Sequence, residues 1–340
     1  ESQAKGLMEK VTAPVAVEVI SAGKVRRYAH LSFLQHFTVK GLMWSNFKDL
    51  FKIGKGFFQS IAHIRTFKPD VVFTKGGYVC LPVGAAARML RIPLVIHDSD
   101  ARPGLTNKLL SRWADVIATG SPLENYNYPA SKSHYIGVPI GEAFRPKTPA
   151  EQIAAKKSLG FHPDRLLVVA VGGGLGAKSI NLAMNHAAGT LLEQGISALV
   201  VAGKGHYDEA AAGAPGDDRY RVVPFVYEKM DELLGAADIV VSRGSATFLQ
   251  ELAGLGKAVI IVPAHQLGDQ VKNATVFQAA DAAMVVDNEG IEHDNRLEQA
   301  ILALAEDPVL RSEFGERLHA FAKPQATADL ANLILTAGKR

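Results

Sequence analysis

The chain has 340 residues, of which 48% are hydrophobic and 21% charged, and a net charge of only +3. The length suffices for two domains of ordinary size, and the small net charge argues against nucleic acid as a partner. The single cysteine, Cys80, excludes an intrachain disulfide and a cysteine-based metal site. No apolar run approaches the roughly 20 residues of a membrane-spanning helix. No signal peptide is visible, so we expect a globular chain of a reducing cytoplasm.

Residues 15–20 (VAVEVI) predict a strand, and the GLMEK segment before them predicts a helix. The chain begins with Glu1 rather than Met, in what reads as the interior of a domain. We therefore expect that the first strand and helix of this domain are missing.

Residues 28 to 68 are rich in aromatic and basic side chains. Several apolar residues between 47 and 61 fall at helical spacing, which predicts a helix with a core-facing stripe and a solvated basic face. The alternative is a basic and aromatic patch that binds an anionic membrane surface. The residues of this candidate patch are Trp44, Phe47, Lys48, Phe51, Lys52 and Lys55.

Buried strands and helices then alternate up to about residue 140, which is typical of a doubly wound parallel sheet. The predicted strands are Val71–Thr74, Leu94–His97, Val116–Ala118 and Tyr135–Gly137, and the predicted helices are Pro82–Leu90 and one that runs to Trp113. We place a first domain at residues 1–140, a second at 141–323 and a closing helix at 324–340, which we expect to pack back on the first domain.

The second domain opens with a predicted strand, Leu166–Val171, followed by the glycine-rich segment Gly172–Ala177. Glycines at this position allow a phosphate to approach the backbone. The segment also fits the dinucleotide fingerprint G-x-G-x-x-A. That alternative predicts an acidic residue after the next strand, but Ala198–Val201 is followed by Ala202-Gly203-Lys204, which argues against an NAD-dependent dehydrogenase. Further strands are predicted at Val222–Val226 and Ala282–Val286.

Residues 238 to 274 form the most informative stretch. The pattern predicts a strand over Ile239–Ser242, a turn, a helix over Ala246–Leu255 and a strand over Ala258–Val262. The start of such a helix suits a phosphate, and a glutamate in its second turn could accept hydrogen bonds from ribose hydroxyls. The alternative is an ordinary N-capped helix with a solvated glutamate and an arginine in a structural ion pair.

Three motifs carry a resemblance to a known family. They are R-G-S-A-x4-E from Arg243 with the following Q-x-x-N-A from Gln270, the GGY-x-x-x-P run from Gly76, and the H-D-S-D-x-x-P-G-L-T-N run from His97. In these motifs the chain resembles glycosyltransferase family 28, and within it the enzymes of bacterial peptidoglycan synthesis. The resemblance implies an α/β fold with two Rossmann-like doubly wound domains facing a cleft (GT-B).

The resemblance also implies an activity and its site. The reaction would be the inverting transfer of N-acetylglucosamine from UDP-GlcNAc to the 4-hydroxyl of undecaprenyl-pyrophosphoryl-MurNAc-pentapeptide. The implied donor-binding residues are Asp100, Gly174, Leu175, Gly176, Val226, Arg243, Ser245, Ala246, Thr247, Glu251 for the ribose, Gln270 for the sugar, and Asn273. Those on the acceptor side are Gly76, Gly77, Tyr78, Thr106 and Asn107. The candidates for the general base are Asp98 and His97, with Asp100.

The chain departs from the family pattern at several positions. Asp98 replaces a glutamate, Asp100 an asparagine, Gly174 a serine and Gly141 an arginine, whose contact with the diphosphate Arg145 could supply instead. The family's N-terminal G-T-G-G-H loop is absent. We expect no essential metal and no cofactor besides the donor substrate.

The implied partners are the lipid-linked acceptor, the anionic inner-membrane surface at its cytoplasmic face, where the chain would be peripheral, and other cell-wall synthesis proteins. Two alternatives stay open: an isomerase similar to UDP-GlcNAc 2-epimerases, and a protein that binds the donor without turnover.

Overall fold

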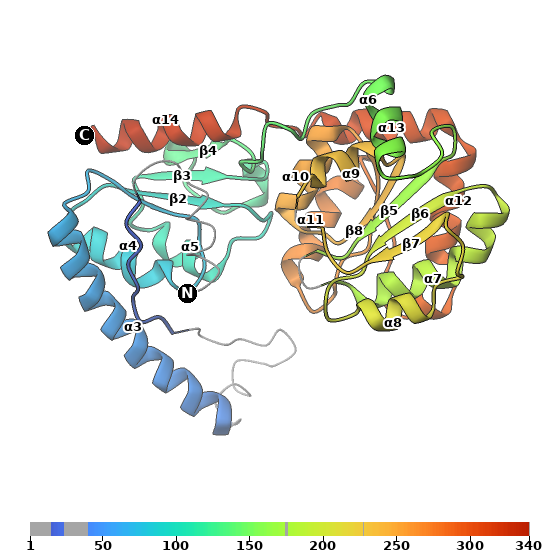
Figure 1. Cartoon of the computed structure of the whole chain (residues 1–340). Coiled ribbons are helices and arrows are strands. Elements are labelled where there is room, and N and C mark those ends of the chain that lie inside the picture. Colours follow the sequence, from blue (N-terminus) through green and yellow to red (C-terminus); the bar gives the residue numbers. More distant parts are fainter. Residues whose placement is uncertain (1–14, 24–39, 174–175, 227, 340) are drawn as a thin grey trace.

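The computed structural model describes residues 15–23, 40–173, 176–226 and 228–339, and it shows two α/β domains side by side (Figure 1). Each domain is built around a parallel sheet. This confirms the predicted fold class of two Rossmann-like domains.

The first domain has a four-stranded parallel sheet in the order β1-β2-β3-β4. Its elements are α3 (Lys40–Phe67), β1 (Val72–Thr74), α4 (Cys80–Met89), β2 (Leu94–Asp98), α5 (Leu105–Leu110), β3 (Val116–Thr119), the short turns η1 (Leu123–Asn125) and η2 (Ala130–Lys132), and β4 (Ser133–Tyr135). The strands are short, and α3, α4 and α5 pack on one face of the sheet through a cluster that includes Ile61, Ala86 and Leu110.

The second domain has a six-stranded parallel sheet in the order β10-β9-β8-β5-β6-β7. Its strands are β5 (Leu167–Val171), β6 (Ser197–Val201), β7 (Tyr220–Val223), β8 (Ile239–Ser242), β9 (Ala258–Ile261) and β10 (Met284–Val285). The strand order reverses between β5 and β8, which are direct neighbours. Doubly wound sheets bind ligands at this reversal, outside the carboxyl ends of the strands.

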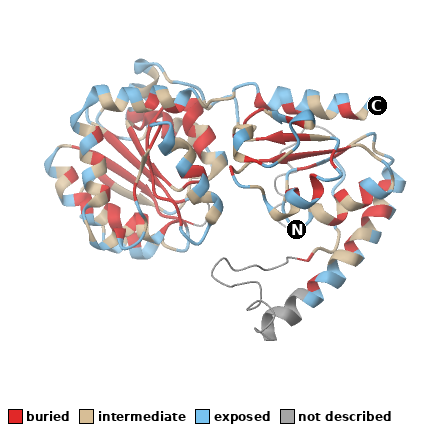
Figure 2. Cartoon of the chain, turned by 180° about the vertical axis from the view of Figure 1, so that it is seen from behind, coloured by how far each residue is buried: buried red, intermediate tan, exposed pale blue. Residues whose placement is uncertain are grey.

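Helices cover both faces of the second sheet, as Figure 2 shows by the buried strands between them. One face carries α7 (Lys178–Glu193), η3 (Ile291–His293) and α12 (Arg296–Glu306). The other carries α6 (Pro149–Ser158), α9 (Met230–Ala236), α10 (Ala246–Leu255), α11 (Gly268–Ala279) and α13 (Pro308–His319). A further helix, α8 (Tyr207–Ala212), precedes β7. Because both faces are covered, most strand residues are apolar.

The last helix, α14 (Ala326–Gly338), leaves the second domain and lies along the first (Figure 1). Leu330 is buried with Ala118 of β3 and Ile136, and Leu333 and Ile334 pack beside them. The helix thus covers the face of the first sheet that α3, α4 and α5 leave open. The chain crosses between the domains twice, before α6 and before α14.

Several predicted elements differ from the structure. Residues 15–20 form no strand, because none of the described strands bonds to their backbone. The next residue, Ser21, instead donates its backbone N–H to the side-chain oxygen of Gln59 in α3. The predicted GLMEK helix lies outside the described residues. The strand predicted to Val226 ends at Val223, the one predicted at Tyr135–Gly137 ends at Tyr135, and the helix predicted to reach Trp113 ends at Leu110.

Candidate functional site

The reversal in the second sheet brings two helix starts together, at α7 after β5 and at α10 after β8. Neither Ala177 nor Ser245, the residues that precede these helices, caps its helix through a side-chain hydrogen bond. Backbone N–H groups in the first turns therefore remain available to an anion, which helix starts bind well. Gly176 adopts φ +77°, and a Cβ there would lie 2.2 Å from the carbonyl oxygen of Ala202, so only glycine fits. Gly174 and Leu175 lie outside the described residues.

Arg243 lies in the turn between β8 and α10, where its guanidinium is partly buried. Burial lowers its pKa. Within the described ranges its side chain makes no hydrogen bond and no ion pair, so the structural ion pair that the sequence left open is not formed there. A desolvated, unpaired guanidinium is well suited to a phosphate group, which it can bind through two parallel hydrogen bonds.

Glu251, in the second turn of α10, is partly buried, and burial raises the pKa of its carboxyl group to about 7. In the part of the chain that the structure describes, the carboxylate has neither a hydrogen bond nor an ion pair. Desolvating a carboxylate without a partner is costly. Such a group is therefore a good candidate to accept hydrogen bonds from a ligand, as the ribose prediction requires.

The remaining predicted donor residues lie in three segments of the second domain. Ala246 and Thr247 form the first turn of α10, Gln270 is in the first turn of α11, and Val226 lies beyond the end of β7. The Gln270 side-chain oxygen accepts a hydrogen bond of 3.2 Å from the backbone of Ala264. Its amide nitrogen makes no hydrogen bond to the described residues.

Asn273 is placed differently from the other predicted donor residues, because its side chain is buried and fully engaged. Its Oδ1 accepts a hydrogen bond of 2.8 Å from the backbone of Ala101, and its Nδ2 donates to Asp100 Oδ1 and to the carbonyl oxygen of Gly244, both at 2.9 Å. It thus connects the two domains. The Oδ2 atom of Asp100 has no partner among the described residues.

His97 is completely buried at the end of β2. Its Nε2 lies 2.9 Å from the carbonyl oxygen of Gly137 and its Nδ1 3.3 Å from the hydroxyl of Ser99. Burial is the main reason that its pKa falls to about 4, and the charge of Lys75 adds to it. The ring is therefore neutral at pH 7, and it holds the chain where it leaves the first domain.

Asp98 is also buried, with 4% of its surface exposed. Its carboxylate accepts a hydrogen bond of 2.7 Å from the hydroxyl of Tyr128, whose ring stacks on Tyr126. Burial raises the pKa of Asp98 to about 6, although bonds from Tyr128 and Asn107 act in the opposite direction. Of the three candidate bases, His97 and Asp98 are buried, whereas Asp100 is half-buried and its Oδ2 has no partner among the described residues. The two tyrosines were not predicted as site residues, because they lie in a loop without periodicity.

We expect the Asp98→Asn variant to be more stable than the parent by about 1–3 kcal/mol at pH 7. The folded-state pKa of about 6 is above the ordinary value of 3.8, so folding favours the protonated carboxyl. Its stabilising contribution is complete below about pH 4 and is lost as the pH rises through 6. Urea unfolding between pH 4 and 8 would show this. The exposed Asp164→Asn is the control, and an Asp98→Asn variant that is less stable at pH 7 would contradict the assignment.

The predicted acceptor-side residues divide into two groups. Gly76 and Gly77 both have positive φ, 83° and 84°, in the turn after β1, and Tyr78 is exposed beside them. Thr106 is half-buried at the start of α5. Asn107 is buried, and its Nδ2 donates to the carbonyl oxygen of His97 at 2.9 Å. Its role in the structure is to tie α5 to the end of β2.

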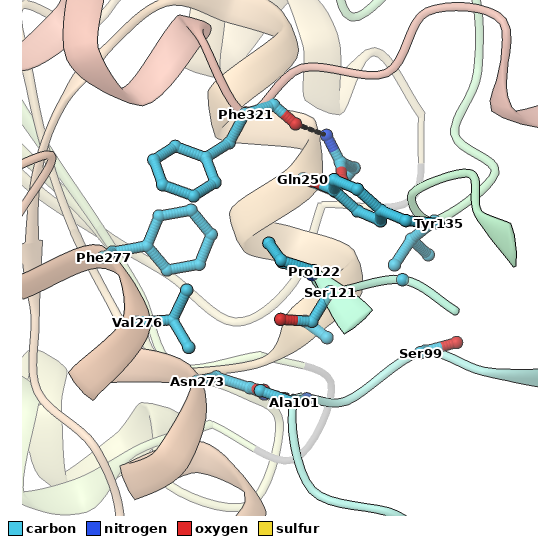
Figure 3. Close-up of a pocket in the computed structure, with 13 residues that line it drawn as sticks. Ser99, Ala101, Ser121, Pro122, Tyr135, Gln250, Asn273, Val276, Phe277 and Phe321 are labelled. Atoms are coloured by element: carbon cyan, nitrogen blue, oxygen red, sulfur yellow. Dashed lines mark hydrogen bonds between the residues drawn. The ribbon is translucent and has the colours of Figure 1, made fainter. Parts of the chain in front are cut away.

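A small pocket lies between the domains, lined on one side by Ser99, Ser121 and Tyr135 and on the other by Gln250 and Phe277 (Figure 3). Beside it, Gln250 donates to the carbonyl oxygen of Phe321 at 2.9 Å, which anchors the segment that leads to α14. The pocket is next to the start of α10, but Arg243 and Glu251 do not line it. It belongs to the packing between the domains rather than to the donor residues.

The predicted core-facing stripe is wrong for three of the aromatic residues of α3. Phe47, Phe51 and Phe58 are 50%, 67% and 71% exposed, whereas Ile61 and Ile64 in the C-terminal half of the helix reach the core. Lys48, Lys52 and Lys55 are exposed between the aromatic residues, and Lys52 pairs with Asp49. The side chain of Trp44 lies outside those the structure describes. Among the described helices, none is long and apolar enough to cross a membrane.

No group of histidine, cysteine, aspartate and glutamate side chains among the described residues has the arrangement of a metal site. What the site offers instead is a pair of free helix starts, an unpaired guanidinium and an unpaired carboxylate at the reversal of a doubly wound sheet. Together with the first domain that faces it, this defines a GT-B protein with a site suited to a nucleotide diphosphate.

The comparisons with known proteins identify the family. The model of the glycosyltransferase family 28 N-terminal domain matches residues 3–119, and that of the C-terminal domain matches residues 167–326. The chain belongs to glycosyltransferase family 28.

Its relatives include two transferases. The UDP-N-acetylglucosamine–N-acetylmuramyl-(pentapeptide) pyrophosphoryl-undecaprenol N-acetylglucosamine transferase of Geobacillus kaustophilus is 36% identical, over 85% of this chain and 76% of the relative. The enzyme of the same name from Clostridium kluyveri is 32% identical, over 94% and 85%.

Among solved structures, MurG of Acinetobacter baumannii is 28% identical with a TM-score of 0.70, over 85% of this chain and 79% of that one. A UDP-GlcNAc 2-epimerase from Neisseria meningitidis shares the fold at 15% identity and a TM-score of 0.62, over 84% and 82%.

Proposed function

We propose that the chain transfers N-acetylglucosamine from UDP-GlcNAc to the 4-hydroxyl of the undecaprenyl-pyrophosphoryl-linked MurNAc-pentapeptide, with inversion at C1. The observation that carries the proposal is the pair of unsatisfied groups around α10, namely the guanidinium of Arg243 and the carboxylate of Glu251. The relatives that cover most of the chain are named for this reaction.

In this proposal the diphosphate of the donor lies at the starts of α7 and α10 and binds Arg243. The positive ends of the two helices and the guanidinium stabilise the charge that develops on UDP as it leaves. Glu251 accepts hydrogen bonds from the ribose hydroxyls, and Gln270 reaches the sugar. The acceptor hydroxyl approaches from the first domain and loses its proton during a single displacement. His97 and Asp98 are buried at the end of β2 and hold the backbone of the first domain beneath the acceptor side.

The lipid-linked acceptor requires a membrane, and the exposed aromatic and basic face of α3 supports membrane binding. Phenylalanine side chains on one helix face can enter the headgroup region, while lysines beside them attract anionic lipids. Phe47, Phe51 and Phe58 recur at intervals of four and seven residues, so they lie on one side of the helix. We therefore place the protein at an anionic membrane surface, as a peripheral protein of the cytoplasmic face.

Replacing Lys52 and Lys55 by glutamine should weaken binding to vesicles that contain anionic lipid by about 30-fold, at roughly 1 kcal/mol per lysine. Glutamine keeps the helix propensity, so the fold should not change. Co-sedimentation with vesicles of phosphatidylglycerol and neutral lipid measures the effect. The control pair is Lys157→Gln with Lys229→Gln in the second domain, where both side chains are exposed. Equal losses in the two pairs would refute the assignment of α3.

The donor assignment is tested by binding selectivity. Calorimetry should show that UDP and UDP-GlcNAc bind with similar enthalpies, and that ADP and NAD bind much more weakly. If NAD or ADP bound as tightly as UDP-GlcNAc, the assignment of the nucleotide site would be wrong. The isomerase alternative predicts release of UDP-ManNAc from UDP-GlcNAc without an acceptor, which product analysis distinguishes from transfer.

A further inference from the structure

One side chain of α11 joins both domains to the turn that carries Arg243 and Ser245. Asn273 has one oxygen and two N–H groups for hydrogen bonding, and all three are used. The oxygen and one N–H bond to the first domain, at the backbone of Ala101 and the carboxylate of Asp100, and Nδ2 also donates to Gly244. Nothing on this side chain is left to donate to a sugar.

The loop after β2, which Asn273 contacts, is also held from within the first domain. The hydroxyl of Tyr126 donates to the carbonyl oxygen of Asp100 at 2.7 Å, and Tyr126 is buried. Its ring stacks on Tyr128 with centroids 5.4 Å apart, and Tyr128 bonds to Asp98. The loop after β2 is therefore held from both directions, and Asn273 meets a fixed surface.

The contact with the donor turn is equally close. A Cβ on Gly244 would lie 2.4 Å from the carbonyl oxygen of Gln270, so the turn packs directly on the backbone of α11. The bond from Asn273 then fixes the carbonyl of Gly244, and with it the direction in which Arg243 and the N–H groups after Ser245 point. Both neighbours of Gly244 are predicted to bind the diphosphate.

We propose that Asn273 is a positioning residue: it locks the loop after β2 of the first domain onto the donor turn of the second, and it acts on the diphosphate through that turn rather than on the sugar. The inference rests on the proposed function for the ligand. The connection between the domains rests on the hydrogen bonds alone. Each of these hydrogen bonds alone contributes modestly to stability, but all three belong to one buried side chain. Their loss would therefore weaken both the contact with the first domain and the contact with the donor turn.

The test compares Asn273→Asp with the double variant Asn273→Asp/Asp100→Asn. The single variant removes both N–H donors and places two carboxylates against each other, which separates the domains here. The double variant restores one donor and one acceptor across the same contact and keeps the net charge of the parent, so recovery in it shows that the two positions are coupled. The matched control is Asn185→Asp, a half-buried position whose bonds to Ala210 and Tyr220 stay within the second domain.

Two measurements are made on each variant, amide hydrogen exchange at Ala101 and calorimetric titration with UDP and with UDP-GlcNAc. The single variant should exchange the Ala101 amide at least tenfold faster and should lose affinity for UDP and UDP-GlcNAc by the same factor, about five- to tenfold. The double variant should recover the protection of Ala101 and part of the affinity, since its new carboxylate cannot donate to Gly244. Asn185→Asp should change neither.

A loss of affinity confined to UDP-GlcNAc would show that Asn273 contacts the sugar, and it would overturn the inference. Unchanged exchange at Ala101 in the single variant would overturn it as well. If the parent chain bound no UDP-GlcNAc, the proposed function would fail, whereas the exchange data would still decide whether Asn273 connects the domains. The two failures are thus distinguishable.

Discussion

Binding of UDP-GlcNAc should tighten about tenfold between pH 6 and pH 8. Burial raises the pKa of Glu251 to about 7, so about one carboxyl in ten is ionised at pH 6 and about nine in ten at pH 8. The ribose hydroxyls donate to the ionised form, and the affinity therefore rises with pH as the proton is lost. The diphosphate of UDP-GlcNAc is a diester and does not titrate in this range, so calorimetry at intermediate pH values isolates the carboxyl group.

The control for this prediction is Glu251→Gln. Its amide keeps the shape and one acceptor but cannot ionise, so its affinity should be flat across the same pH range and close to that of the parent at pH 6. A Glu251→Gln variant that kept the pH dependence of the parent would show that another group is responsible, and the ribose assignment would lose its support.

The second large effect is expected at Arg243. The Arg243→Ala variant should bind UDP and UDP-GlcNAc between 10- and 100-fold more weakly, because a charge-assisted hydrogen bond contributes about 1.5–3 kcal/mol. Arg243→Lys should recover only part of the loss, since an ammonium group cannot make two parallel bonds to a phosphate. Calorimetry with both ligands measures the effect, which should be the same for each.

Arg145 provides a matched control for Arg243. The sequence left open that Arg145 supplies the diphosphate contact that the family places at position 141. In the structure its guanidinium instead pairs with Glu151 at 2.6 Å, where α6 begins. Arg145→Ala should therefore leave nucleotide affinity unchanged. If the Arg145 variant lost as much affinity as Arg243→Ala, the diphosphate would lie closer to the segment between the domains than to α10.

The sequence predicts the architecture of the second domain well, because its strands are continuous apolar runs between clear turn residues. The strand Ile239–Ser242 and the helix Ala246–Leu255 have the predicted bounds. The strand predicted at residues 15–20 does not form, since alternation alone says nothing about a neighbouring strand to pair with. The aromatic residues of α3 failed as a core stripe for the same reason: spacing defines a face, but not what covers it.

The sequence indicates which residues belong to the candidate site, but it says less about what each side chain contacts there. Glu251 and Arg243 follow from their place in one local motif, at the end of a strand and along one helix. Asn273 was expected to bind the donor because it is polar and lies at the same edge, but its partners Asp100 and Ala101 are more than 170 residues away in the chain. Only the packing of the two domains reveals them. The same holds for Tyr128 and its bond to Asp98.

The proposed transfer of N-acetylglucosamine is tested by following the labelled sugar from UDP-GlcNAc in the presence and absence of the undecaprenyl-linked muramyl-pentapeptide. We expect UDP to be released only when the lipid acceptor is present, with the label recovered in the lipid and with inverted configuration at C1. Release of UDP without the acceptor, or conversion of UDP-GlcNAc to its 2-epimer, would contradict the assignment as a transferase.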